Sequence, residues 1–389
     1  MQHSIYRQLL RKAAVLIAAA MIAVCTGCAG GQNTDGAAAG AAKEADPNEL
    51  QTKELFAMDT YMSLTAYGED AEAALEEAAA EIARLDEMLA AERESSEIAA
   101  INQNGGGPVS DETAELVMKA KEIGEMTDGA FEITLYPVKQ LWGFKEEGNR
   151  VPADEEITKA LTLVGSDKVS VDETASDQGS AEGQNAIVFA QPGMEIDLGG
   201  IAKGYTSASV IRIFEAHNVK GLVNLGGNVQ ACGTKPDGSD WRVAVRKPES
   251  REDDDIQWFD AATKEGKALT RADFLGIVET NDEAVITSGG YERYFEQDGK
   301  VYQHILDPKT GRPSESDTVS VTIVCKDGAL ADGLSTSLFV MGTEKATKLW
   351  RSGAAEFEMI LLDKQGKLYV TEGLRDRFSS DLEVNWISK

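Results

Sequence analysis

Two side chains in an otherwise apolar helix carry the first chemical signal of this sequence. The stretch "ADGLSTSLFVMG" at 331–342 contains Asp332 and Thr336 but no Lys or Arg. Residues four apart lie on one face of a helix, so the carboxylate and the hydroxyl point the same way. Such oxygen ligands suit Mg²⁺, whereas His and Cys are too scarce for a zinc site. For this helix alone, a capping Asp332 and a Thr336 bonded to a backbone carbonyl are the structural alternatives.

A glycine turn and a histidine are two further candidates for chemistry. The stretch "DLGGIAKG" at 197–204 places two glycines between an expected strand and a helix, where backbone N–H groups favour an anion. Lys203 adds a positive charge, although such turns also arise for steric reasons alone. His304 precedes Asp307 by three residues, a spacing that lets the carboxylate orient the imidazole for proton transfer. A purely structural histidine is the alternative.

The charge balance excludes one class of partner. The 389 residues include 38 Lys and Arg against 66 Asp and Glu, which gives a net charge of −28 at pH 7. Such a surface repels nucleic acid and argues against a polybasic membrane contact. The hydrophobic share of 42% is enough for a substantial core, in one large domain or two small ones.

The N-terminal segment has the features of an export signal. Positively charged residues precede an apolar run at 13–24 that is too short to cross a membrane, and small residues follow it. Thr-Gly directly before Cys28 resembles a bacterial lipoprotein box, although Cys25 replaces the usual Leu. We therefore expect a signal peptide at 1–27, lipidation of Cys28 and a flexible tether at 28–54. An ordinary signal peptide with an incidental cysteine is the alternative.

The folded part combines strands and helices in an irregular order. Alternating apolar residues predict a strand within 56–68, and an amphipathic helix is expected at 71–90. Another helix is expected at about 111–127, with Ser110 or Asp111 as its N-cap. Three segments have the pattern of a strand, a turn and a strand: 221–233, 292–305 and 358–374. Because strands mostly adjoin strands, the pattern favours an α+β fold with mixed or antiparallel sheets and interspersed helices.

Two polar segments are expected to be excursions from this fold. One is 172–185, between two short strands, and the other is an acidic stretch that starts at 249 and ends near 270. A separate helix is expected near 344–352. The cysteines Cys232 and Cys325 are consistent either with a disulfide, which export permits, or with two buried thiols.

Five motifs together resemble the ApbE family, the FAD:protein FMN transferases. They are "DLGGIAKGY" at 197–205, "NLGGN" at 224–228, "TSGGYERYF" at 287–295, "HILDPKTGRP" at 304–313 and "DGLSTSLFVMG" at 332–342. Further matches are "MDTYMSLTAYG" at 58–68, "SSEIAAIN" at 95–102 and "DGAFEITLYPVKQLWGF" at 128–144. The motifs follow the family's order over nearly all of the folded chain. The resemblance implies a single ApbE-like, T-fold-like domain at 55–389.

The resemblance implies a reaction and its residues. Family members bind FAD and Mg²⁺, split the pyrophosphate with release of AMP, and attach FMN through a phosphoester to Ser or Thr of an exported protein. The implied metal ligands are Asp332, Thr336 and the carbonyl of Ala202, so a cation would be the partner of the carboxylate. His304 is then the expected base for the acceptor hydroxyl, with Asp307 orienting it.

Nine positions are carried over as FAD contacts, several of them through the backbone. They are Met58, Asn102, Ala130, Phe131, Glu132, Gly199, Lys203, Tyr205 and Leu306, with Asn102 at the adenine end. The chain departs from the family at three points. Glu132 replaces the more frequent Asp, an aromatic residue often found before the Ser-Glu-Ile motif is missing near Glu92, and Gly290 replaces an Asp.

The resemblance leaves alternatives of other classes. An FAD pyrophosphatase would use water in place of the protein hydroxyl, and a flavin-binding lipoprotein would hold FAD without reaction. A base such as His304 favours an enzyme, since storage of flavin needs none. We expect an exported protein, lipid-anchored to the outer face of the cytoplasmic membrane.

Overall fold

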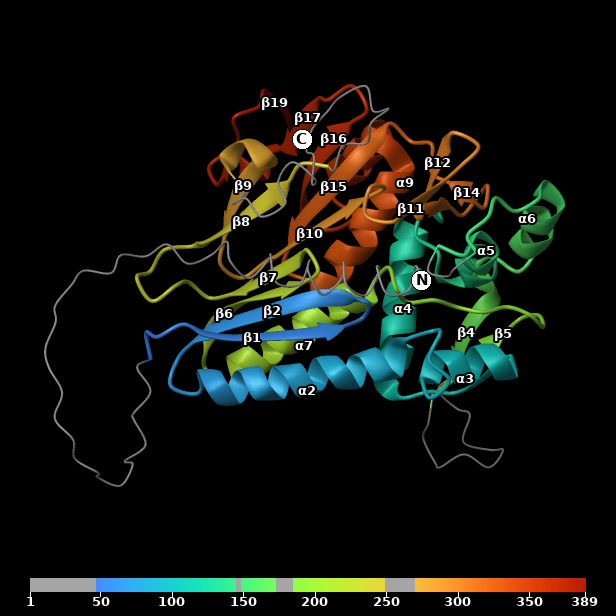
Figure 1. Ribbon diagram of the computed structural model, residues 1–389, viewed down its shortest axis with the longest axis horizontal. Coiled ribbons are helices and arrows are strands. Elements are labelled where there is room, and N and C mark those ends of the chain that lie inside the picture. Colours follow the sequence, from blue (N-terminus) through green and yellow to red (C-terminus); the bar gives the residue numbers. More distant parts are fainter. Residues whose placement is uncertain (1–46, 145–147, 173–184, 249–269) are drawn as a thin grey trace, which may run out of the picture.

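The structure is a computed structural model, and it describes residues 47–389 apart from three gaps: 145–147, 173–184 and 249–269 (Figure 1). The expected signal peptide at 1–27 and the lipidation site Cys28 lie outside the described residues, as do most of the two polar excursions. Within the described part of the chain, no helix is long and apolar enough to span a membrane.

A nine-stranded sheet forms the centre of the fold. In spatial order its strands are β1 (Gln51–Ala57), β2 (Thr60–Tyr67), β6 (Lys220–Leu225), β7 (Asn228–Cys232), β10 (Ala284–Gly289), β15 (Thr318–Cys325), β16 (Glu358–Asp363), β17 (Leu368–Thr371) and β19 (Val384–Ile387). Neighbouring strands are antiparallel except for β17 and β19, which are parallel. The α+β fold with a mixed sheet is therefore confirmed.

Helices and small sheets surround this central sheet. The helices are α2 (Ala71–Leu89), α3 (Glu97–Asn104), α4 (Asp111–Met126), α5 (Tyr136–Trp142), α6 (Asp154–Leu161), α7 (Ala202–Ala216) and α9 (Gly328–Ser352). The 3-10 turns are η1 (Ile133–Leu135), η2 (Ser166–Lys168), η4 (Arg271–Asp273) and η5 (Glu372–Leu374). One three-stranded sheet has the order β3 (Gly106–Pro108), β5 (Ala186–Phe189), β4 (Val169–Asp172). A second has the order β18 (Phe378–Ser379), β9 (Phe274–Thr280), β8 (Trp241–Arg246). Two hairpins are β11 (Tyr294–Gln297) with β12 (Lys300–Gln303), and β13 (Leu306–Asp307) with β14 (Arg312–Pro313).

The central sheet is buried on both faces near its middle. Ile286 and Ile323 belong to the apolar cluster that contains the α9 side chains, whereas the adjacent Val285 and Val324 pack with residues of β8 and β9. Successive residues of a strand point to opposite faces, so each strand contributes to both clusters. Helix α9 thus covers one face and the β8–β9 sheet covers the other (Figure 1).

Helices α7 and α9 touch backbone to backbone at a pair of glycines. A Cβ atom at Gly204 would stand 2.1 Å from the carbonyl oxygen of Gly328 and 2.6 Å from the Cβ atom of Asp332. A Cβ atom at Gly328 would stand 2.5 Å from the carbonyl oxygen of Gly204. No other residue type fits at either position without displacing a helix. The contact sets the distance between the two helices that carry the candidate site.

Several expected elements are confirmed. The strand predicted within 56–68 is β2, and the helix predicted at 71–90 is α2. The helix predicted at 111–127 is α4, and its N-cap is Ser110, whose hydroxyl oxygen accepts a hydrogen bond from the Thr113 backbone N–H at 3.2 Å. The three strand–turn–strand patterns are the pairs β6–β7, β11–β12 and β16–β17.

Other expectations are wrong in detail. Residues 194–198 are extended but join no sheet, although a strand was expected there. The helix expected near 344–352 continues from the Asp332 helix across a kink at Gly342, where φ is 80°. The first strand begins at Gln51, so ordered chain starts before the expected boundary at Leu55.

The two cysteines do not pair. Cys232 and Cys325 are both buried and free. Burial raises the pKa of the Cys232 thiol to about 11 and that of the Cys325 thiol to about 12. Of the two sequence-based alternatives, buried thiols are the one that the structure supports.

Replacing Gly204 by Ala should test the helix contact. The added Cβ atom meets backbone at 2.1 Å, so we expect the free energy of unfolding to fall by about 1–3 kcal/mol or more. Urea unfolding followed by circular dichroism measures this. Gly290→Ala is the matched control, because its Cβ atom would meet only the flexible side chain of Gln303 at 3.1 Å, and we expect a change within about 0.5 kcal/mol. Equal effects of both changes would contradict the account.

Candidate active site

Asp332 points from α9 to the start of α7. Its Oδ2 atom accepts a hydrogen bond of 2.8 Å from the backbone N–H of Gly204, and the residue is only 3% exposed. Burial raises the pKa of this carboxyl, while the Lys203 charge and the Gly204 N–H act in the opposite direction. The helix contact thus places an acidic side chain directly at a helix N-terminus.

The oxygen atoms around Asp332 fit a hard divalent cation. Thr336 lies one turn further along α9, is half-buried, and has its Oγ1 atom 3.3 Å from the Ser288 hydroxyl. The carbonyl oxygen of Ala202, the first residue of α7, accepts a hydrogen bond of 2.8 Å from the Thr206 hydroxyl. Within the described ranges no group of three His, Cys, Asp or Glu residues could hold a metal. One carboxylate, one hydroxyl and one carbonyl are nevertheless ligands that Mg²⁺ takes together with waters and phosphate oxygens.

A buried amide lies beside Asp332. The side-chain nitrogen of Asn228 has no hydrogen bond of normal geometry within the described residues, yet this side chain is directed at the Asp332 carboxylate and lowers the pKa of that carboxyl. Buried polar atoms are nearly always bonded. Asn228 therefore adds a donor beside the carboxylate at this point of the fold.

His304 is held as a neutral imidazole. Both its backbone N–H, at 3.0 Å, and its Nδ1 atom, at 3.1 Å, contact the carbonyl oxygen of Arg293. A carbonyl only accepts, so Nδ1 carries the proton and Nε2 keeps its lone pair. Burial, together with the charges of Lys139, Arg293 and Lys203, lowers the pKa of His304 to about 3. The side chain is therefore a neutral base at physiological pH.

The expected contact between Asp307 and His304 is absent. The Oδ1 atom of Asp307 accepts from the Lys309 backbone N–H at 2.8 Å, which closes the turn after β13. Within the part of the chain that the structure describes, no hydrogen bond joins Asp307 to His304. The carbonyl of Arg293 orients the imidazole instead, and Asp307 shapes the loop that follows.

Positive charges gather around these groups in a strongly acidic protein. Lys139, Lys203 and Arg293 act on His304, and Arg246 joins Lys203 and Arg293 in acting on Glu292. Acids lie among these cations: Lys139 is ion-paired with Asp197, and Arg293 lies 4.0 Å from Asp59. The cationic side chains are nevertheless groups that can bind a multiply charged anion such as a pyrophosphate.

The extended segment before α7 is held by side chains instead of a neighbouring strand. The amide of Asn102 donates to the carbonyl oxygen of Ile196 and accepts from its N–H, both at 2.8 Å. The Asp197 carboxylate accepts from the Gly199 N–H at 2.9 Å and from the Lys139 ammonium. The glycine turn is therefore fixed from two sides.

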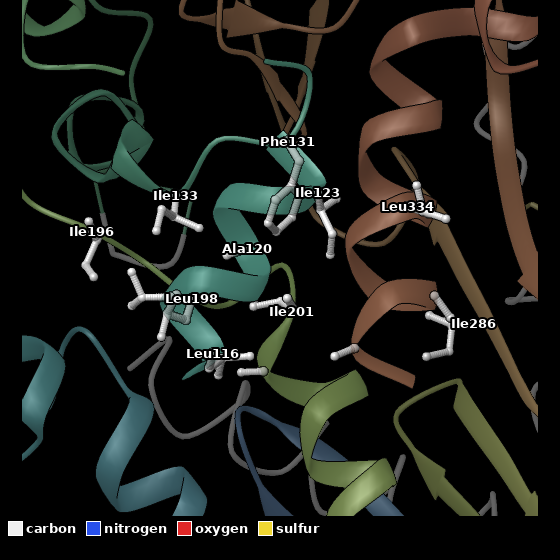
Figure 2. Packing of buried hydrophobic residues seen from close by; sticks show 14 of the residues in the cluster. Leu116, Ala120, Ile123, Phe131, Ile133, Ile196, Leu198, Ile201, Ile286 and Leu334 are labelled. Carbon is white, nitrogen blue, oxygen red and sulfur yellow. The ribbon is translucent and has the colours of Figure 1, made fainter. Parts of the chain in front are cut away.

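The same segment is anchored in the core. Figure 2 shows Ile196, Leu198 and Ile201 in one cluster with Phe131 and Ile133. A Cβ atom on the second turn glycine would stand 3.1 Å from the Phe131 ring, so bulk is excluded there. The motif that contains Phe131 thus packs against the glycine turn.

Several predicted FAD contacts already have partners within the protein. The carboxylate of Glu132 accepts four hydrogen bonds from Thr134 and Ser166, so it fixes the loop around η1. Leu306 is buried in an apolar cluster with Val138 and Trp142. Any contact that Ala130 or Glu132 makes with FAD would involve the backbone, and these roles stay predictions.

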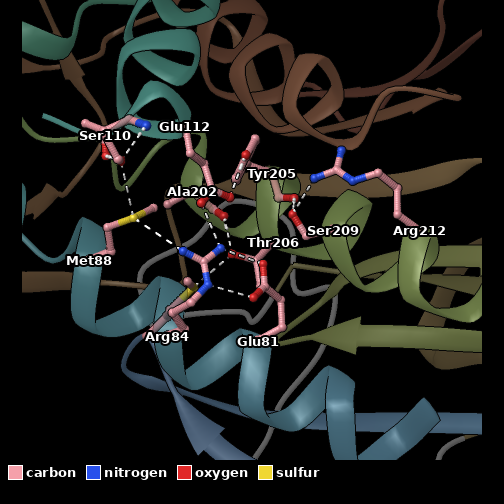
Figure 3. A network of polar contacts seen from close by, with 12 residues as sticks. Glu81, Arg84, Met88, Ser110, Glu112, Ala202, Tyr205, Thr206, Ser209 and Arg212 are labelled. Carbon is pink, nitrogen blue, oxygen red and sulfur yellow. Dashed lines mark hydrogen bonds and ion pairs between the residues drawn. The ribbon is translucent and has the colours of Figure 1, made fainter. Parts of the chain in front are cut away.

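Tyr205 of α7 is bonded to α4. Its hydroxyl donates to Glu112 at 2.7 Å, and Glu112 is ion-paired with Arg84 of α2 (Figure 3). Burial, together with Glu112, raises the pKa of Tyr205. This network joins α2, α4 and α7, so Tyr205 first of all positions its helix.

The turn between β1 and β2 closes the site on the other side. Met58 adopts a positive φ of 47°, and its sulfur lies 3.8 Å from the Thr206 hydroxyl, which itself bonds to Ala202. Asp59 lies 4.0 Å from the Arg293 guanidinium. Met58 is thus placed beside the expected metal ligands, while Asp59 reaches the residue that orients His304.

Known proteins share this arrangement of motifs and fold. The sequence model of the ApbE family matches residues 58–361. The chain belongs to the ApbE family. It is 33% identical over 302 residues to an FAD:protein FMN transferase of Klebsiella pneumoniae, covering 77% of this chain and 84% of the relative. A relative of the same name from Escherichia coli K12 is 30% identical over 292 residues, covering 74% and 75%. The curated relatives are transferases, and this ApbE family member is an enzyme of that class.

Solved structures agree with this assignment. The ApbE protein of Thermotoga maritima superposes with a TM-score of 0.72 at 29% identity, covering 85% of this chain and 99% of that one. The flavinyl transferase ApbE of Pseudomonas stutzeri, in its apo form, gives 0.69 at 30% identity and covers 86% and 98%. The predicted fold and family are therefore both confirmed.

Some residues of the site were missed in the sequence although they lie within the quoted motifs. Lys139 is in the motif at 128–144, Asn228 ends "NLGGN", and Arg293 is in "TSGGYERYF". A count of positive charges inside the motifs of this acidic chain would have found Lys139 and Arg293. The buried amide of Asn228 has no signal in the sequence.

Asn102→Ala should loosen the glycine turn. The variant leaves two backbone groups of Ile196 without partners, so we expect a loss of about 1–3 kcal/mol in the free energy of unfolding. Asn185→Ala is the control, since that amide makes one exposed bond to Asp111. Chemical denaturation measures both. A loss for Asn102→Ala no larger than for the control would show that the segment is held by packing alone.

The depressed pKa of His304 should appear in the pH dependence of stability. The unfolded chain binds a proton on this residue below about pH 6.5, whereas the folded chain does so only near 3, so stability falls as pH drops through this interval. When the pH is lowered from 7 to 5, protonation of His304 in the unfolded chain lowers the free energy of unfolding by about 2 kcal/mol.

In His304→Gln this loss is absent. We therefore expect its free energy of unfolding to fall less over the same pH range, by about that amount, than that of the unsubstituted chain. Identical pH profiles would contradict a neutral, desolvated His304.

Proposed function

We propose that the chain is an Mg²⁺-dependent FAD:protein FMN transferase. It transfers FMN from FAD to a Ser or Thr hydroxyl of an exported protein, forms a phosphoester and releases AMP. The observation that carries the proposal is the placement of Asp332 at the N-terminus of α7, beside the glycine turn. The names of the curated relatives support the same activity.

Residues on two sides of the site would bind the anionic part of FAD. Lys139, Lys203 and Arg293 supply positive charge, and the turn at 199–200 lets a phosphate approach the backbone closely. Asp332, Thr336 and the Ala202 carbonyl would hold Mg²⁺, which when bound neutralises charge on phosphate oxygens. Catalysis of phosphoryl transfer rests mainly on such positioning and charge stabilisation.

The neutral imidazole supplies the proton acceptor. In the proposed reaction the acceptor hydroxyl oxygen attacks the phosphorus atom on the FMN side, and the bond to the bridging oxygen breaks, so AMP leaves with that oxygen. The hydroxyl proton passes to Nε2 of His304, whose lone pair is available because Nδ1 donates to Arg293. Burial, helped by the charges of Lys139 and Arg293, lowers the pKa of the imidazole and so keeps it neutral before the acceptor binds.

The location of the enzyme is part of the proposal. We infer export and lipid anchoring at Cys28 from the N-terminal sequence, with residues 28–50 as the tether of a domain that begins at β1. The acceptor would then be an exported protein at the outer face of the cytoplasmic membrane.

The direct test is covalent labelling. The purified chain, FAD, Mg²⁺ and a protein that the Klebsiella pneumoniae relative labels with FMN are incubated together. Gel fluorescence after denaturation reports bound flavin, and chromatography reports AMP. We expect labelling that EDTA abolishes and that Asp332→Asn lowers at least a hundredfold. Asp327→Asn on the same helix retains an N-cap residue and should keep full activity.

The other outcomes identify the alternatives. AMP and free FMN without labelled protein would replace the transferase by an FAD pyrophosphatase that uses water as the acceptor. FAD that stays intact under all conditions would leave a flavin-binding lipoprotein. Labelling that persists in EDTA would remove the metal from the proposal.

A further inference from the structure

One edge of the central sheet is open within the described residues. Among them, strand β1 is the terminal strand of the sheet and pairs only with β2. Met58 and Asp59, with φ of 47° and 58°, form a two-residue turn between the paired residues Ala57 and Thr60. In an antiparallel ladder only alternate residues bond to the partner strand. Counting back from this turn, Thr52, Glu54 and Phe56 direct their N–H and C=O groups away from β2.

These three residues also have exposed side chains, and one of them is a large aromatic. Phe56 is 72% exposed, more than any other large hydrophobic residue in the described ranges. It lies opposite Tyr61 of β2 in the register, and Tyr61 donates a hydrogen bond to Glu54. We call Thr52, Glu54 and Phe56 the β1 edge surface. It combines free main-chain donors and acceptors with an aromatic anchor, which a monomeric surface rarely leaves exposed without a use.

The β1 edge surface leads to His304. The strand ends in the Met58–Asp59 turn, and Asp59 lies 4.0 Å from Arg293, whose carbonyl binds the imidazole. The residue after Arg293 is Tyr294, a second large side chain with 42% exposure. An exposed aromatic residue is thus close in sequence to each partner of the Asp59–Arg293 contact: Phe56 to Asp59, and Tyr294 to Arg293.

We propose that the acceptor protein docks on the β1 edge surface as an added strand. This inference rests on the proposed function, because only a transferase to protein needs a polypeptide at this place. Main-chain hydrogen bonds to Thr52, Glu54 and Phe56 would hold the segment, and Phe56 would pack against one of its side chains. The hydroxyl-bearing residue then lies beyond the Phe56 end, on the side of Arg293 and His304.

A second copy of the chain is the competing occupant. Edge-to-edge pairing of two β1 strands is geometrically open. The proximity of the edge to His304, through Asp59 and Arg293, favours the acceptor as the occupant.

Two variants separate main-chain pairing from general effects. Glu54→Pro removes an N–H on the open edge without removing a β1–β2 bond, and Glu54→Ala is its matched control because it loses the same Tyr61 contact. Phe56→Ala removes the aromatic anchor, with Val188→Ala, another exposed hydrophobic residue, as its control. The substrate is the protein labelled by the Klebsiella pneumoniae relative, and FAD affinity is followed by flavin fluorescence.

We expect Glu54→Pro and Phe56→Ala each to raise KM for the acceptor about tenfold, with FAD affinity and the kcat reached at saturating acceptor unchanged. Unchanged KM in both variants, with normal labelling, would overturn the docking site and leave the transferase intact. A dimer in light scattering that Glu54→Pro dissociates would overturn it in favour of a second copy. Failure of the unsubstituted chain to label an acceptor that its relative labels would overturn the proposed function and this inference with it.

Discussion

The contact between Gly204 of α7 and Gly328 of α9 is the constraint on which the candidate site depends. It brings two helix backbones so close that no Cβ atom fits between them, and it places the Asp332 carboxylate on the Gly204 N–H at 2.8 Å. A carboxylate at this depth is costly unless it is paired. The helix N-terminus offsets part of that cost, and a bound cation would offset more.

The other half of the site is fixed by polar side chains acting on backbone. The Asn102 amide and the Asp197 carboxylate hold the glycine turn, and the Arg293 carbonyl holds His304. These bonds leave the backbone of the turn and the Nε2 atom of His304 available to ligands. Lys139, Lys203 and Arg293 bring positive charge to the same place, where it acts on His304.

Local pattern was enough to predict the elements whose periodicity is strong. Strand β2 and helix α2 follow from alternation and from a helical stripe, and Ser110 was one of two expected caps for α4. The family and the α+β fold followed from the motifs. The approximate domain start failed by a few residues because β1 has a mostly polar sequence on an open edge.

Long-range contacts explain what the sequence did not reveal. Residues 194–198 look like a strand, but Asn102 supplies the bonds that a neighbouring strand would, from 94 positions away. The spacing of His304 and Asp307 suggested a pair, yet the Arg293 carbonyl took the imidazole and the Lys309 N–H took the carboxylate. The bond from Lys309 is a local turn contact, two residues along the chain. The Arg293 contact is not visible in a local window, because the hairpin β11–β12 brings Arg293 to His304.

Metal binding to the chain itself tests the central claim most directly, independently of any acceptor. Mn²⁺, which takes the same oxygen ligands as Mg²⁺, is titrated into the purified chain and the free ion is counted by electron paramagnetic resonance. We expect one site whose affinity falls at least tenfold in Asp332→Asn and also in Gly204→Ala, while Asp327→Asn binds normally. Unaltered binding by Asp332→Asn would show that the carboxylate held by the α7–α9 contact is not a metal ligand.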